Sequence, residues 1–182
     1  DWLGFCCERI YTSTGLMNKI TLLIAYSLLL VSCEKDKISG DLIEDPKLYS
    51  SLYSDSVDTL TIGRDNYIIE AELYRDFFPG GPIPRKSPLI ASVYLVKCDS
   101  ISIPDHIQIK KMYVISNQII WASDPPDNRL SKFPDFRLYG LSNNGPIWDT
   151  GIAVDVILKI SDNSIPKDYL LIAKNQIIKR IE

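Results

Sequence analysis

The stretch "GIAVDVILKI", residues 151–160, decides the class of fold, because its apolar residues recur at every second position. The side chains that share one face of an extended chain here are Ile152, Val154, Val156, Leu158 and Ile160. Asp155 and Lys159 fall on the opposite face. A spacing of two is typical of a β-strand with one buried face, whereas a helix would need apolar residues three or four positions apart.

Further stretches between turn-rich segments have the same β-strand character. They are residues 66–74, 89–98, 107–115, 118–123, 136–141 and 168–181. The stretch 89–98 is apolar on both faces, which is typical of a central strand. Ser116–Asn117 predicts a tight hairpin turn between 107–115 and 118–123, because Asn tolerates a positive φ angle.

These strands predict an all-β domain over residues 58–182. Since parallel sheets need crossover connections, usually helical, and no helical segment separates the strands, we expect antiparallel pairing. The leading architecture is an antiparallel immunoglobulin-like β-sandwich of about seven strands, with Trp121 as its core tryptophan, preceded by a signal peptide and a flexible tether. A small β-barrel is the alternative.

Residues 17–32 have the organisation of a secretory signal peptide. Met17-Asn18-Lys19 supplies a short positive start, and the apolar run "ITLLIAYSLLLV" follows. The run is shorter than the about 20 residues that a transmembrane helix needs. A buried core helix would normally show a polar face. We therefore expect residues 1–16 to be a non-native upstream extension that the mature protein lacks.

The end of this segment, Leu30-Val31-Ser32-Cys33, resembles the bacterial lipobox. The resemblance implies cleavage after Ser32 and attachment of lipid to Cys33, which becomes the mature N-terminus. Several acyl chains would anchor the protein stably to a membrane. The implied location is the bacterial cell envelope at the outer membrane, on either its periplasmic or its surface-exposed side. An ordinary signal peptide with a coincidental cysteine is the alternative.

Residues 33–57 are expected to comprise the lipidated cysteine and a tether. The first part, "EKDKISGDLIEDP", is polar and charged and has little to bury. The following "PKLYSSLYSDS" is compatible with a helical turn, since Leu48 and Leu52 are four apart, or with an extended lead-in. Because Cys98 is the single cysteine left beyond Cys33, no internal disulfide is expected in the mature chain.

Two segments of the domain resemble small uncharacterised lipoproteins of Bacteroidetes-type bacteria. They are "ELYRDFFPGGPIPRKSPLIASVYLV" and "NGPIWDTGIAVDVILKI", at residues 72–96 and 144–160. The resemblance implies the same envelope address and a single domain. It implies no activity, ligand or catalytic motif.

Few residues carry recognisable chemistry. The net charge of −3, without a Lys/Arg run, argues against nucleic acid as a partner. His106 is the single histidine, so a His-rich metal site is excluded, and we expect neither a metal nor a cofactor. Cys98 ends an apolar stretch and is predicted to be a buried structural thiol.

Two loops contain candidate contact residues. Residues 75–88 combine Phe77 and Phe78 with Arg85, and Trp148 lies in a second loop, where aromatic and basic groups suit a carboxylated glycan or a protein partner. The alternative is that these aromatic residues plug the end of the core. The loop 123–135 supplies oxygen donors for calcium, but their spacing matches no EF-hand, and they are also ordinary turn residues: Asp124, Asp127, Asn128 and Asp135.

The sequence therefore predicts a lipid-anchored cell-envelope β-sandwich that acts as a binding or structural module for protein or glycan. An accessory subunit of an envelope complex is one alternative. An enzyme with a carboxylate site assembled from Asp76, Asp124 or Asp149 is another, although the chain shows no catalytic motif.

Overall fold

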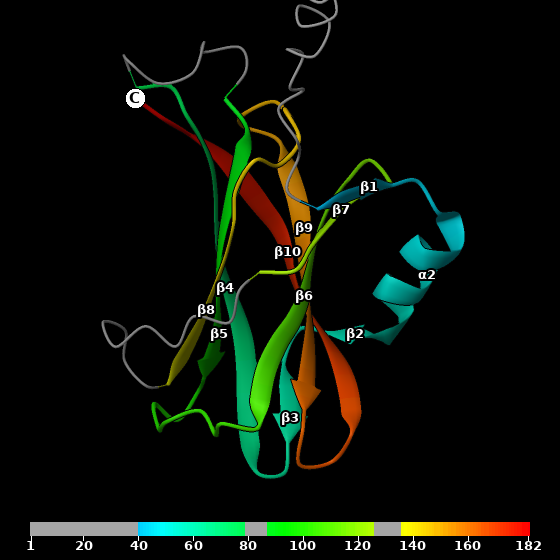
Figure 1. Ribbon diagram of the computed structural model, residues 1–182, viewed down its shortest axis with the longest axis vertical. Helices are drawn as coiled ribbons and strands as arrows, with labels where there is room; N and C mark the ends of the chain where they lie inside the picture. Colours follow the sequence, from blue (N-terminus) through cyan, green and yellow to red (C-terminus); the bar gives the residue numbers. More distant parts are fainter. Residues whose placement is uncertain (1–39, 79–86, 126–135) are drawn as a thin grey trace, which may run out of the picture. The chain divides into compact units, whose positions relative to one another are not determined.

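A computed structural model describes residues 40–78, 87–125 and 136–182. These residues form ten strands and one helix, so the predicted all-β class is confirmed (Figure 1). The elements are β1 (Asp41–Ile43), α2 (Pro46–Asp55), β2 (Ser56–Val57), β3 (Leu60–Ile62), β4 (Asp65–Asp76), β5 (Leu89–Lys97), β6 (Ile107–Ser116), β7 (Ile119–Ser123), β8 (Arg137–Ser142), β9 (Ala153–Asp162) and β10 (Lys167–Ile181). The predictions for the signal peptide, Ser32, Cys33 and Arg85 lie outside the described residues.

The strands form a sheet with the order β1-β7-β6-β9-β10-β4-β5-β8, to which β2 and β3 add at β10 and β4. The long strand β10 connects the two halves of this order. Its residues 167–177 pair antiparallel with β9, and its residues 178–181 pair in parallel with β4. Figure 1 shows β10, in orange and red, passing from β9 to β4. An irregularity between Ala173 and Gln176 marks the change of partner, as expected of a β-bulge.

The expectation of wholly antiparallel pairing is wrong, because β10 pairs in parallel with both β4 and β2. The parallel partners are far apart in sequence, and the chain between them builds the other strands. No dedicated crossover helix is therefore needed. The described residues also contain ten strands rather than about seven, since β1, β2 and β3 are short additions.

The main core lies between the two halves of the sheet, which curls so that the halves face each other. Residues of both halves belong to one buried cluster, including Tyr67, Leu95, Met112, Trp121, Leu158 and Ile178. Trp121 has 0% of its surface exposed, which confirms its predicted place in the core.

A second cluster lies under α2, on the outer face of the half formed by β6, β7, β9 and β10. Leu52 of the helix packs there with Ile115, Ile120, Ile157 and Ile172. Residues 40–57, which we expected to belong to a tether, instead form β1, α2 and β2. The helical alternative for "PKLYSSLYSDS" is therefore the one that the structure contains.

Two local predictions need correction. The tight turn between β6 and β7 consists of Asn117 and Gln118, one residue later than predicted, because Ser116 still pairs with Ile119. Cys98 is exposed rather than buried. The strand β5 ends at Lys97, and Lys97 takes the inward position with ion pairs to Asp65 and Asp99 at 3.1 and 3.4 Å.

Candidate functional site

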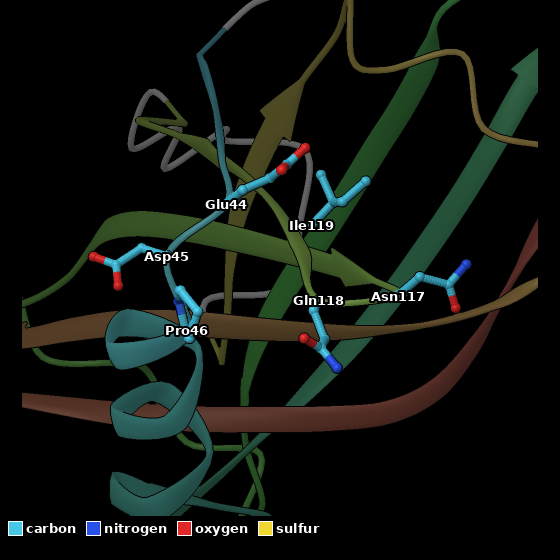
Figure 2. Close-up of a pocket in the computed structure, with 6 residues that line it drawn as sticks. All are labelled: Glu44, Asp45, Pro46, Asn117, Gln118 and Ile119. Atoms are coloured by element: carbon cyan, nitrogen blue, oxygen red, sulfur yellow. The ribbon is translucent and has the colours of Figure 1, made fainter.

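A polar cleft lies between the chain that leads from β1 into α2 and the turn between β6 and β7 (Figure 2). Its first part has a volume of about 400 Å³ and is lined by Glu44, Asp45, Pro46, Asn117, Gln118 and Ile119. Its second part, of about 320 Å³, shares the two turn residues and adds Tyr49, Tyr53, Ile115, Ser116, Ala153, Val154, Asp155 and Asn175. We call these two parts together the α2 cleft.

The helix end that borders the cleft is fixed by local chemistry. Asp45 is the N-cap, and its Oδ1 accepts hydrogen bonds from the backbone N–H groups of Lys47 and Leu48 at 2.8 and 3.3 Å. Pro46 follows at the first helical position, where its missing N–H has no cost. Leu48 and Leu52 then bind the helix to the sheet. Figure 2 shows this segment on one side of the cleft and the β6–β7 turn on the other.

A hydrogen-bond network holds α2 to β9 and β10 inside the cleft. The Tyr53 hydroxyl donates to Asp155 Oδ2 at 2.6 Å, and the Asn175 backbone N–H donates to Asp155 Oδ1 at 2.8 Å. Burial, and then the Asp155 carboxylate, raise the pKa of Tyr53 well above its usual value, so its hydroxyl stays neutral. The Tyr49 ring lies beside Tyr53, with 4.8 Å between ring centroids. Both oxygens of Asp155 are thereby engaged by the protein itself.

Three backbone positions of the cleft have positive φ angles. Asn117, Gln118 and Asn175 have φ angles of 48°, 69° and 57°, and they are three of the five non-glycine residues with positive φ in the described part of the chain. Asn adopts this region with little cost, but a glutamine does so much less readily, and such turns favour glycine. Strained residues of this kind cluster at functional sites.

The lining of the α2 cleft carries carboxylates and amides but no Lys, Arg or His among its described residues. Asp45 and Asp155 already accept hydrogen bonds from the protein. Glu44, the second carboxylate oxygen of Asp45 and the side-chain amides of Asn117 and Gln118 therefore remain for an incoming molecule. Such a set suits a neutral or positively charged ligand and disfavours an anion.

The aromatic residues predicted as contacts do not line the α2 cleft, and they are only partly brought together. Phe77 is half-buried, and its ring centroid lies 5.1 Å from the Arg75 guanidinium and 4.2 Å from that of Arg180. Trp148 is half-buried against the main core, whereas Phe78 is 52% exposed. Phe78 is thus the most accessible of the three.

Arg75 connects the loops around Ser87 and Trp148 to β4. It is buried and donates from Nε to the Ser87 carbonyl at 2.7 Å and from a terminal nitrogen to the Trp148 carbonyl at 2.9 Å. Burial lowers the pKa of Arg75, and the charge of Asp149 opposes that shift. The arrangement therefore ties two loops to β4, which is a structural task.

The carboxylates considered for an enzyme have separate partners. Asp76 accepts a hydrogen bond from the Phe78 backbone N–H at 2.9 Å, and Asp124 forms an ion pair with Lys111 at 3.4 Å. Asp149 acts electrostatically on Arg75. No group of three His, Cys, Asp or Glu side chains suited to a metal occurs in residues 40–78, 87–125 and 136–182; the calcium candidates Asp127, Asn128 and Asp135 lie outside those ranges.

A second polar and aromatic surface covers the outer side of β4, β5 and β8. Tyr94 and Tyr139 pair across β5 and β8 with 5.2 Å between ring centroids, and Arg137 forms an ion pair with Glu70 at 3.0 Å. Burial raises the pKa of Tyr94. We call these four residues the tyrosine face.

Sequence reasoning did not find the α2 cleft. It identified Asn117 as a turn residue and Asp155 as outward-facing, but it assigned neither to a site. The four-residue spacing of Tyr49 and Tyr53 was the available signal, because an α-helix places such residues on one face. Nothing local indicated that Asn175 would meet Asp155, twenty residues away along a hairpin.

Comparisons with protein-family models, curated proteins and solved structures found no match. In the described ranges, no helix has both the length and the apolar character needed to cross a membrane.

Proposed function

We propose that this chain is a lipid-anchored cell-envelope binding module that takes a protein or glycan partner in the α2 cleft. The observation that carries the proposal is that exposed amide and carboxylate side chains line one open cleft together with three backbone positions of positive φ. In this proposal the protein is a small lipoprotein of the Bacteroidetes type, held at the outer membrane by lipid on Cys33.

Strand pairing supports an immunoglobulin-like sandwich as the architecture of the module. In chain order, β4 to β10 would correspond to strands A, B, C, C′, E, F and G. Pairing of β5 with β8 then matches B with E, and pairing of β6 and β10 with β9 matches C and G with F. The hairpin partner β7 extends the sheet as C′ does.

If Cys33 carries lipid, only residues 34–39 separate it from Gly40, where the described part begins. Six residues at full extension reach at most about 20–25 Å. The proposed anchor would therefore hold the domain close to the membrane surface.

Lipid attachment is tested by Cys33→Ala in cells fed an alkyne-tagged fatty acid. We expect the variant to lose the label and to leave the membrane fraction. Cys98→Ala is the matched control, since it removes the exposed cysteine of the domain and should keep both label and membrane association. Unchanged labelling of the Cys33→Ala protein would refute the anchor.

Binding is tested by titrating the full chain, in detergent, with three sets of probes while backbone amide NMR signals are recorded. The sets are neutral oligosaccharides, short peptides and the polyamine spermidine. We expect the oligosaccharides or the peptides to give saturable shifts at Asn117 and Asn175, with spermidine as the cationic comparison. If no probe shifts either amide at millimolar concentration, the cleft is not a binding site and the proposed function fails.

The tyrosine face favours a second candidate function, an accessory subunit of an envelope complex. Tyrosine and arginine are enriched at protein–protein interfaces, and here they lie together on one sheet face. Arg137→Glu should then release the protein from a larger assembly on native gels, while Lys110→Glu, elsewhere on the surface, should not. If both variants and the wild-type protein migrate as a free monomer, the role as an accessory subunit is refuted.

A further inference from the structure

We propose that the ligand of the α2 cleft is a neutral, hydroxyl-rich glycan, and that Gln118 is a specificity-determining residue that contacts it. This inference rests on the proposed binding function. It adds the class of ligand and the residue that determines specificity for that class.

The hydrogen-bonding groups of the cleft that have no partner among the described residues suit the hydroxyl groups of a ligand better than its charged groups. A sugar hydroxyl both donates and accepts, and a side-chain amide offers one acceptor oxygen beside two donor hydrogens. Asn117 and Gln118 bring two adjacent amides to the turn, and Glu44 brings a carboxylate on the β1–α2 side; in Figure 2 these three side chains point in different directions. Both oxygens of Asp155 and Oδ1 of Asp45 are occupied by internal donors, so Glu44 and the second oxygen of Asp45 are the carboxylate acceptors left for a ligand.

An anionic glycan is disfavoured by the same lining. Three carboxylates border the cleft, and none of its described residues is Lys, Arg or His. A ligand carboxylate or sulfate would lose its hydration and meet like charge. An uncharged glycan has no charge to desolvate and is not repelled by the carboxylates. The half-buried Tyr49, which lines the second part of the cleft, offers an aromatic surface for the C–H groups of a sugar.

The backbone of Gln118 indicates why a glutamine stands at this position. In a two-residue turn with positive φ at both positions, the second residue is commonly glycine, as in Asn-Gly. Here the chain reads Asn117-Gln118, with φ of 69° at the glutamine. The Gln118 side chain is exposed, and it forms no hydrogen bond to another described residue that would offset the cost of its positive φ angle. A contact with a ligand would account for its presence.

The inference predicts opposite effects of one substitution on stability and on binding. Gln118→Gly removes both strain and side chain, so its midpoint of urea unfolding should rise while its affinity for a neutral oligosaccharide falls by about tenfold, as expected for one or two lost hydrogen bonds. Ser100→Gly is the matched control, because Ser100 also has a positive φ, of 60°, and lines neither part of the cleft. It should stabilise the protein and leave affinity unchanged.

The experiment is a glycan array probed with the full chain, followed by calorimetric titration of the best binder. The array carries neutral chains of hexoses, N-acetylhexosamines, pentoses and deoxyhexoses, with sialylated and sulfated chains as the anionic set. Binding of neutral chains alone, weakened in Gln118→Gly and kept in Ser100→Gly, is the expected result.

Two results would overturn the inference while leaving the proposed function intact. These are selective binding of the anionic set, and cleft shifts with peptide in the absence of any neutral-glycan binding. Cleft shifts with spermidine alone would overturn both the inference and the proposed protein or glycan partner. Equal affinity of the wild-type and Gln118→Gly proteins for a neutral glycan would refute the role of Gln118. Failure of every probe class would refute the binding function itself.

Discussion

Asp162 is a buried carboxylate at the end of β9, with 2% of its surface exposed. It accepts hydrogen bonds from the Ser164 N–H and hydroxyl at 2.9 and 2.5 Å, and its Oδ1 lies 3.8 Å from His106 Nε2. The bonds from Ser164 lower the pKa of Asp162 by more than burial raises it. The ionised form is therefore the one that stabilises the turn between β9 and β10.

This shift predicts a pH-dependent loss of stability on the acid side. Because the folded pKa lies below the unfolded value of about 3.9, the contribution is fully present above that value and is lost as pH falls through the folded pKa. Asp162→Asn should be less stable than the wild-type protein near pH 6, and the difference should shrink below pH about 4. Urea unfolding of both proteins between pH 2.5 and 6 measures it. A difference that stays constant over that range would exclude the ionised carboxylate as its source.

Lys97 and Cys98 illustrate what the sequence could not decide about single residues. Strand alternation places one of the two inside, and hydrophobicity favours the cysteine. The structure instead places Lys97 inside, where burial lowers its pKa and hydrogen bonds to Asp65 and Asp99 raise it by more. These partners come from β4 and from the turn after β5, so no local pattern could identify them.

At the scale of elements, α2 is the unit whose role depended on tertiary contacts. Its ten residues are too few for a stable helix alone in water. Asp45, Pro46 and the Leu48/Leu52 pair made a helix compatible with the sequence, but the outer face of β6, β9 and β10 gives it a surface on which to pack. The same docking creates one wall of the α2 cleft.

Leu52→Ala should therefore release α2 selectively. Leu52 is 2% exposed, and its truncation should lower the free energy of local opening of the helix by about 2–5 kcal/mol. Hydrogen exchange should accelerate in α2 and β2, while β5 and β9 keep their protection. Leu42→Ala, at a leucine that is 47% exposed in the neighbouring β1, is the control and should change little. Uniform acceleration throughout the domain would show that α2 is part of the global folding unit.

At the scale of the whole molecule, the end of β10 holds the two halves of the sheet together. Only its last residues, 178–181, pair with β4, and Ile178 is fully buried in the core between the halves. The neighbouring Ile177 is 49% exposed. Two isoleucines in adjacent positions thus differ in the surface that they bury.

Ile178→Ala should lower the free energy of unfolding by about 2–5 kcal/mol, because it leaves a cavity where the halves meet. Ile177→Ala should cost much less, since water already reaches that side chain. Chemical denaturation monitored by Trp fluorescence compares them directly. Similar losses in the two variants would contradict the position of Ile178 in the shared core.

The sequence by itself determined the all-β class, the buried Trp121 and, to within one residue, the turn of the main hairpin, because these follow from side-chain periodicity and turn chemistry along one strand or turn. Only the tertiary structure decided the parallel pairing of β4 with β10, the docking of α2 and the existence of the α2 cleft. Each of these depends on segments far apart in the chain. Tyr53 meets Asp155 because α2 docks on the apolar outer face of the sheet, and Asn175 meets Asp155 because β9 and β10 pair as neighbouring strands. Periodicity records which face of a strand is buried, but it does not record which strand lies next to it.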